Sequence, residues 1–171
     1  MSMIIGSDII FYSRLYYFCK KNVMDYEHLK LENQLCFPFY AVSRLIIRAY
    51  QDDLDALGIT YPQYLVMLVL WEQDGITVNE ISERLILNTN TITPLLKRME
   101  TMELIKRTPS REDQRRVIVT LKEKGRIMKE QAAEIPYHLL QKLKVDPSQT
   151  NIEEATKLKE QLRYLIELLN R

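Results

Sequence analysis

Apolar residues recur with a helical period along most of the chain and with a strand period over one short stretch. Between about residues 29 and 57, apolar positions three and four residues apart predict a long first helix that ends at Gly58. TYPQ at 60–63 and TVNE at 77–80 both have the form of a capping box, so each predicts the start of another helix. Asp74-Gly75 separates these two helices.

The next part of the chain changes from helical to strand-like patterning. A fourth helix is predicted to start at Asn88, whose side chain can cap it, and its apolar positions continue to Met99. Two β-like runs follow, LIKRTPS and RRVIVTL, joined by the polar turn SREDQ. Two short helices followed at once by a basic hairpin predict a winged helix-turn-helix.

Two further helices are predicted near the end of the chain. TLKE at 120–123 predicts the cap of a helix that runs to about Leu143, with a kink or break at Pro136. After the linker DPSQT, a last helix carries apolar residues from Ile152 to Leu169. The expected fold class is mainly α with a small β-hairpin wing: a winged helix-turn-helix with long N- and C-terminal dimerisation helices.

The sequence predicts four parts within one compact domain. These are an N-terminal extension (1–23), the segment of the long first helix (24–60), the winged helix-turn-helix (61–120) and the C-terminal helices (121–171). The extension is apolar, but Asp8 and Arg14 interrupt it and no basic segment precedes it, so it makes a poor signal peptide or membrane span. The native protein is predicted to begin at Met24.

Composition limits the chemistry that the chain can support. A net charge of +1 over 171 residues gives no global basic field, so a DNA site must be built from local charge. Two cysteines and two histidines match no zinc-ligand spacing. We therefore expect no metal and no cofactor, and a reducing, cytoplasmic location without membrane association.

Local positive charge gathers on the fourth helix and the hairpin. Short polar side chains at the helix start can reach phosphates or base edges, and Arg115 at the hairpin tip fits a narrow minor groove, with Asp113 able to hold its guanidinium. A solvated surface and simple helix capping are the alternative interpretations. The residues expected to contact DNA are Asn88, Thr89, Asn90, Thr91, Thr93, Lys97, Arg98, Arg111, Asp113, Arg115 and Arg116.

The order of elements, with SREDQRRVIVTLKEKG over the wing, resembles the MarR family of dimeric winged-helix transcription regulators. KLENQLCFPFYAVSR, LGITYPQYLVMLVLWE and TITPLLKRME resemble its OhrR-like subgroup, repressors that sense organic hydroperoxides. The likeness covers about residues 28–145 and departs at 88–90, where Asp-Ser-Gly would be expected. It implies a homodimeric repressor of double-stranded operator DNA, and no enzyme.

The resemblance also implies a redox site. Its reactive cysteine corresponds to Cys36, and tyrosines that hydrogen-bond or enclose it correspond to Tyr40, Tyr50 and Tyr61. Independently, the thiolate is the form that attacks a peroxide, and phenolic hydroxyls can stabilise that anion. Tyr40 is four residues from Cys36 on the same helical face, whereas Tyr50 is roughly 21 Å along a straight helix at ~1.5 Å per residue. A contact between Cys36 and Tyr50 therefore needs a second chain.

Pro38 leaves two possible starts for the first helix. If the helix begins close to Cys36, Pro38 lies in the first turn, and the helix dipole helps a thiolate. If it begins near Leu29, Pro38 frees the carbonyl of Gln34 and kinks the helix.

The expected mechanism is oxidation of Cys36 by an organic hydroperoxide to a sulfenic acid, followed by disulfide formation with a low-molecular-weight thiol and release of the operator. Cys19 is a possible resolving residue if residues 1–23 are present. One alternative is a regulator of the same fold that binds a small aromatic ligand, with Cys36 an inert core residue. A second is a thiol peroxidase, against which the lack of a suitably spaced resolving cysteine argues.

Overall fold

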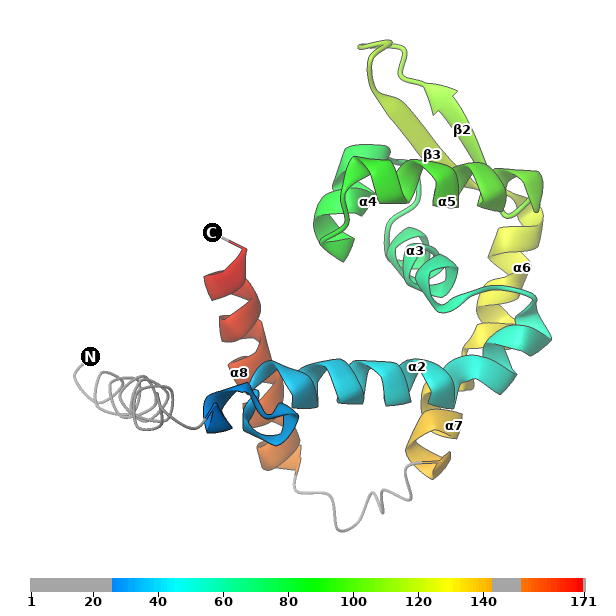
Figure 1. Cartoon of the computed structure of the whole chain (residues 1–171). Helices are drawn as coiled ribbons and strands as arrows, with labels where there is room; N and C mark the ends of the chain where they lie inside the picture. Colours follow the sequence, from blue (N-terminus) through cyan, green and yellow to red (C-terminus); the bar gives the residue numbers. More distant parts are fainter. Residues whose placement is uncertain (1–25, 143–151, 171) are drawn as a thin grey trace. The chain divides into compact units, whose positions relative to one another are not determined.

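The computed structural model describes residues 26–142 and 152–170 (Figure 1). The predicted extension, Cys19 and the predicted linker lie outside these residues. The chain divides into two compact units, Met1–Arg48 and Ala49–Arg171. No side chain between residues 26 and 48 is buried, so this segment has no core of its own.

The long first helix, α2 (Cys36–Leu57), begins later than its apolar pattern indicates. Two short 3-10 turns precede it, η1 (Glu27–Leu29) and η2 (Leu31–Asn33), and the extended backbone of Lys30 separates them (φ −63°, ψ 140°). A helix start near Leu29 is therefore wrong, and the start close to Cys36 is confirmed. Pro38 lies in the first turn, where its missing N–H costs no hydrogen bond.

The second unit contains the winged helix, built from α3 (Tyr61–Glu72), α4 (Val78–Leu85), α5 (Thr89–Thr101) and a small sheet. Both predicted capping boxes form. Gln63 Oε1 accepts a hydrogen bond from the Thr60 N–H at 2.8 Å, and Glu80 Oε2 accepts one from the Thr77 N–H at 2.8 Å. The predicted fold class, mainly α with a small wing, is confirmed.

The sheet has three antiparallel strands in the order β1-β3-β2. The predicted hairpin is formed by β2 (Ile105–Pro109) and β3 (Val117–Leu121), and Arg107 lies opposite Val119. β1 (Ile76–Thr77) also pairs with β3, and the sequence does not predict it because two residues carry no alternating pattern. In Figure 1 the hairpin extends beyond α4 and α5 as a wing.

One core holds the winged helix together. α3 contacts α4, α5 and α6, and apolar side chains from these helices and the sheet are fully buried, among them Val66, Met67, Ile92, Leu96, Ile105 and Val119. Gly125 on α6 (Glu123–Ala132) allows a close backbone approach, since a Cβ there would lie 2.3 Å from the Leu104 carbonyl oxygen. The indole N–H of Trp71 donates to the Gly125 carbonyl at 2.9 Å.

The helices after the wing differ from the prediction in two ways. Lys122 stands at the start of α6, and the cap predicted at TLKE does not form because Thr120 pairs with Lys106 in the sheet. The predicted break falls just before Pro136, between α6 and α7 (Ile135–Lys142). The last predicted helix is confirmed as α8 (Ile152–Leu169).

Among the described helices, no single one is both long and apolar enough to cross a membrane. Only the bent pair α2 and α3 reaches such a length and composition when the two are taken together.

Candidate functional site

The start of α5 presents a row of short polar side chains. The Asn88 carbonyl accepts hydrogen bonds from the Thr91 and Ile92 N–H groups, but its side chain makes no capping bond, so that predicted role is wrong. The side chains of Asn88, Thr89, Asn90 and Thr91 are exposed. Because they are exposed and make no capping bond, these side chains can face a ligand.

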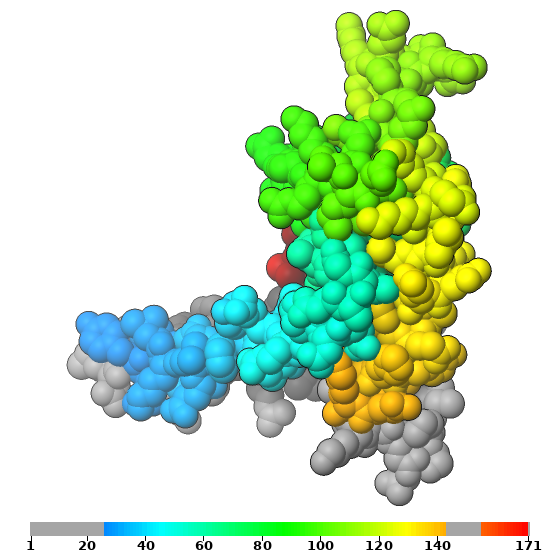
Figure 2. Space-filling view, turned by 90° about the vertical axis from the view of Figure 1, so that its right-hand side faces the viewer, coloured from blue at the N-terminus to red at the C-terminus, as the bar shows by residue number. Residues whose placement is uncertain are grey.

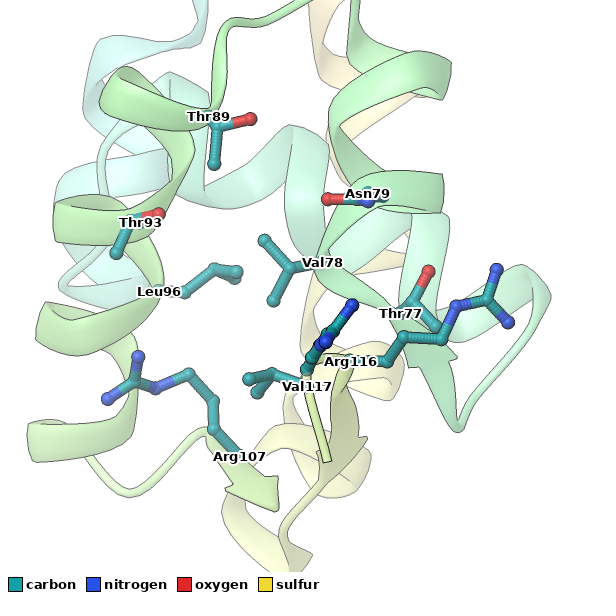
Figure 3. Close-up of a pocket in the computed structure, with 10 residues that line it drawn as sticks. Thr77, Val78, Asn79, Thr89, Thr93, Leu96, Arg107, Arg116 and Val117 are labelled. Atoms are coloured by element: carbon teal, nitrogen blue, oxygen red, sulfur yellow. The ribbon is translucent and has the colours of Figure 1, made fainter. Parts of the chain in front are cut away.

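A cavity of about 200 Å³ lies between the helix-turn-helix and the base of the wing (Figure 3). It brings together four of the predicted DNA contacts, Thr89, Thr93, Arg115 and Arg116. In Figure 3 the side chains of Val78, Leu96 and Val117 lie at its centre, with Thr89 and Thr93 of α5 on one side and Asn79 of α4 on the other. The remaining lining residues are Thr77, Val78, Asn79, Leu96, Arg107 and Val117.

The turn of the wing is held by its own polar groups. The Asp113 carboxylate accepts a hydrogen bond from the Arg115 backbone N–H at 3.0 Å, so it does not hold the guanidinium as predicted. This happens because an aspartate side chain reaches the N–H two residues further along a turn. The Ser110 N–H donates to the Arg116 carbonyl at 2.8 Å and closes the loop.

The cationic side chains among the predicted DNA contacts are all exposed. Figure 2 shows the wing that carries three of them, in yellow-green, projecting beyond α5. Within the part of the chain that the structure describes, none of them forms an ion pair with a carboxylate. Their charges therefore remain available to an anionic partner such as a DNA backbone. These side chains are Lys97, Arg98, Arg111, Arg115 and Arg116.

Arg107 differs from these cations because a carboxylate holds it. Glu100, in the last turn of α5, accepts three hydrogen bonds from Arg107: from its N–H at 2.8 Å, its Nε at 3.0 Å and a terminal guanidinium nitrogen at 2.8 Å. The hydrogen bond from the backbone, and then those from the guanidinium, lower the pKa of Glu100. The carboxylate therefore keeps its charge to a lower pH than an ordinary glutamate.

The four predicted sensor residues divide between the two units. In the first, Cys36 is the first residue of α2 and its thiol is free and exposed. Tyr40, one turn further along α2, is also exposed. In the second, the rings of Tyr50 and Tyr61 lie against each other with centroids 5.3 Å apart.

A third tyrosine, Tyr64, completes an aromatic cluster with Tyr50 and Tyr61. The sequence does not predict Tyr64 as a site residue. Its ring centroid lies 5.9 Å from that of Tyr50 and 6.3 Å from that of Trp71. Burial raises the pKa of Tyr50, Tyr61 and Tyr64, so each phenol keeps its proton and can donate a hydrogen bond. The three-residue spacing of Tyr61 and Tyr64 on one helix is the signal that could have found the third ring.

Within residues 26–142 and 152–170, no three histidine, cysteine or acidic side chains come together as a metal ion would require.

The chain is similar in sequence to known transcriptional regulators. A family model described as "Transcriptional regulator SarA/Rot" matches residues 48–132. An organic hydroperoxide resistance transcriptional regulator of Bacillus subtilis (strain 168) is 46% identical over 145 residues, which cover 85% of this chain and 95% of that protein.

Solved structures of AbfR, a protein of Staphylococcus epidermidis, are similar in fold. Reduced AbfR bound to DNA is 37% identical with a TM-score of 0.70, over 86% of this chain and 100% of that one. A disulfide-formed AbfR is 38% identical with a TM-score of 0.56, over 84% and 97%.

Proposed function

The chain belongs to the MarR family of winged-helix DNA-binding transcriptional regulators, within it to the OhrR-like subgroup, and we propose that it senses organic hydroperoxides through Cys36. In this proposal the reduced protein binds its operator and represses transcription, and oxidation of Cys36 releases the DNA. The protein is a regulator and not an enzyme. A DNA-binding regulator acts where the chromosome is, so its proposed location is the cytoplasm.

The observation that carries the proposal is the position of Cys36. It is a free, exposed thiol at the first residue of a 22-residue helix, in a chain similar to an organic hydroperoxide regulator. The partial positive charge of a helix N-terminus stabilises anions, and the thiolate is the nucleophilic form of cysteine. A peroxide that reaches this helix end can meet the thiol without unfolding the chain.

The proposed chemistry has two balanced steps. The Cys36 thiolate attacks one oxygen of the hydroperoxide, the O–O bond breaks, and a sulfenic acid and an alkoxide form, the latter taking up a proton to become an alcohol. A low-molecular-weight thiol then attacks the sulfenic sulfur, which releases water and leaves a mixed disulfide. Sulfur supplies the two electrons that reduce the peroxide.

A homodimer is part of the proposal because the start of α2 exposes an apolar face. Phe39, Val42 and Leu45 are exposed in the single chain, and α8 exposes Leu158, Leu162 and Ile166. Such faces are typical of surfaces that a second copy covers.

In that dimer, the tyrosines of one subunit would complete the thiol site of the other. Tyr50 and Tyr61 lie together with raised pKa values and keep the protons they would donate to a thiolate. Tyr40 is on the same face of α2 as Cys36 and would line the site from its own chain.

The proposed DNA contacts are those predicted from the sequence. The start of α5 would enter the major groove, and Arg115 would reach the adjacent minor groove from the wing. Loss of the thiolate–tyrosine contacts would shift the first helices and move the two α5 helices out of register with successive grooves. For AbfR, a reduced form bound to DNA and a disulfide form are both known, which supports redox control in a related chain.

The test compares DNA binding before and after treatment with cumene hydroperoxide. The unmodified protein should lose its DNA, and mass spectrometry should locate the new oxygen or disulfide on Cys36. Cys36→Ser should keep its DNA after treatment. Release by the Cys36→Ser variant would contradict the proposed function and favour the alternative of a ligand-binding regulator.

A further inference from the structure

Glu100 is an acidic residue placed among the cations of the DNA-binding surface. It lies in the last turn of α5, and its partner Arg107 lines the cavity at the base of the wing together with Arg115 and Arg116. Figure 3 shows Arg107 and Arg116 in this cavity. A carboxylate near bound DNA repels phosphates, so on electrostatics alone Glu100 should weaken binding. Its contacts suggest a different role.

Glu100 is the residue through which α5 holds the wing. Both of its carboxylate oxygens are used: Oε1 accepts the backbone N–H of Arg107, and Oε2 accepts two guanidinium N–H groups. Because one of these bonds goes to the backbone, Glu100 fixes the strand itself as well as a side chain. The Glu100 and Arg107 side chains are 34% and 23% exposed, so the ion pair is partly shielded from water.

Because Arg107 belongs to the sheet, the contact that restrains Arg107 also restrains the wing. Arg107 is the middle residue of β2 and lies opposite Val119 of β3. The two strands lead directly into the turn that carries Arg111, Arg115 and Arg116. Movement of β2 away from α5 would therefore move the arginines of the turn relative to the α5 residues that would contact the same DNA.

We propose that Glu100 is a positioning residue for DNA binding, which holds the wing at a fixed distance from α5 through Arg107. Glu100 touches no DNA in this proposal; it acts through the placement of the wing arginines. The inference depends on the DNA-binding function of the chain and not on the chemistry of Cys36, so a protein that ignores hydroperoxide could still obey it.

The test measures the affinity of reduced protein for a duplex that the unmodified protein selects from a random-sequence pool, at several salt concentrations. Glu100→Gln keeps the size of the side chain but offers one acceptor oxygen to three donors. We expect it to bind about tenfold more weakly, as befits the loss of charge-assisted hydrogen bonds. The dependence of log K on log salt should become shallower by roughly one unit or more, because wing phosphate contacts are lost.

Glu112→Gln is the matched control. Glu112 is exposed in the turn of the wing, and among the described residues its carboxylate makes no hydrogen bond or ion pair. Removing the same charge there should leave affinity unchanged or raise it slightly, with the salt dependence kept. Urea unfolding of both variants confirms that only folded protein is compared.

Two results would overturn the proposal. One is a Glu100→Gln variant that binds as tightly as the unmodified protein or more tightly, which would make Glu100 a simple repulsive charge. The other is weaker binding with an unchanged salt dependence, which would show that the wing contacts survive without the pair. Failure of the unmodified protein to select any duplex would instead contradict DNA binding itself.

Discussion

The winged-helix region, residues 61–132, buries apolar side chains within one chain, whereas the start of α2, residues 36–48, leaves them exposed. In the winged-helix region Ile81, Leu96 and Ile105 are fully buried within one chain. At the start of α2 no side chain is buried, and Val42 and Leu45 are more than half exposed. One chain is enough to form a DNA-binding surface, whereas the cysteine segment needs something else to cover it.

The winged-helix region and the start of α2 also differ in their polar contacts. Glu100 binds Arg107, and Asp113 binds the backbone of the wing turn, so the winged-helix region fixes its own geometry. Among the described residues 36–48, no side chain forms a hydrogen bond or an ion pair with another group. If it is the sensor segment that we propose, it can change position at little internal cost when the state of the thiol changes.

The largest predicted effect comes from a substitution on the apolar face of α2 that a second chain would cover. Val42→Glu would place an uncompensated charge in the proposed dimer interface at a cost of about 3 kcal/mol or more. That corresponds to a dimer dissociation constant raised by more than about a hundredfold. Light scattering after size exclusion should show a monomer for this variant and a dimer for the control Gln114→Glu in the wing. A dimer in both would contradict the proposed interface.

Gly125→Ala tests whether packing within one chain holds the winged-helix region together. In an exposed helix this change is normally stabilising by about 1 kcal/mol. Here the new Cβ would meet the Leu104 carbonyl oxygen at 2.3 Å, so the free energy of unfolding should fall by roughly 2–3 kcal/mol. Urea unfolding measures it, with the exposed α6 residue Glu130, changed to Ala, as control. A stabilised Gly125→Ala variant would mean that α6 does not lie so close to the turn after α5.

The role of the wing in DNA binding is tested by Arg115→Ala. Loss of a minor-groove arginine should weaken binding about tenfold and reduce the salt slope by roughly 0.9. Titrations at two salt concentrations measure both quantities. Lys157→Ala on α8 removes an equal charge outside the winged-helix region and should leave both unchanged; equal losses in the two variants would indicate nonspecific attraction only.

The smallest effect concerns acid stability. Hydrogen bonds from the Arg107 backbone and then its guanidinium lower the pKa of Glu100 in the folded state. The contribution of the ionised Glu100 carboxylate to the free energy of unfolding is therefore complete above the ordinary glutamate pKa of about 4.3. It is lost as the pH falls through the lowered pKa that Glu100 has in the folded protein. Because the side chain is partly exposed, this amounts to a fraction of 1 kcal/mol. Unfolding at pH 6 and at about pH 3 should show less loss for Glu100→Gln than for the unmodified protein; equal losses would contradict the pairing.

Short-range signals explain what the sequence predicts of the fold. The capping boxes at Thr60 and Thr77 need only neighbouring residues, and both form as predicted. Thr120 has the same local signal, but pairing with Lys106 across the sheet overrides it. The two-residue β1 exists only because β3 is beside it, so no local pattern can predict it.

In the candidate site, too, the sequence predicts some features and does not predict the contacts between residues on different elements. Cys36 and its tyrosines follow from resemblance to a family, and the exposed cations of the wing follow from composition and order. The pairing of Glu100 with Arg107 joins residues on different elements, and neither periodicity nor motif indicates it. Asp113 has the residue type and spacing for either partner, and the turn geometry decides for the backbone.

The central claim, that two chains build each sensor site, is tested most directly by mixed dimers of differently tagged subunits. One subunit carries Cys36→Ser, and its partner carries Tyr50→Phe and Tyr61→Phe, so a cross-subunit site stays intact while a same-chain site does not. The rate of Cys36 oxidation by cumene hydroperoxide should match that of the unmodified dimer. A rate as slow as that of the dimer with both tyrosines replaced in both subunits would contradict the account.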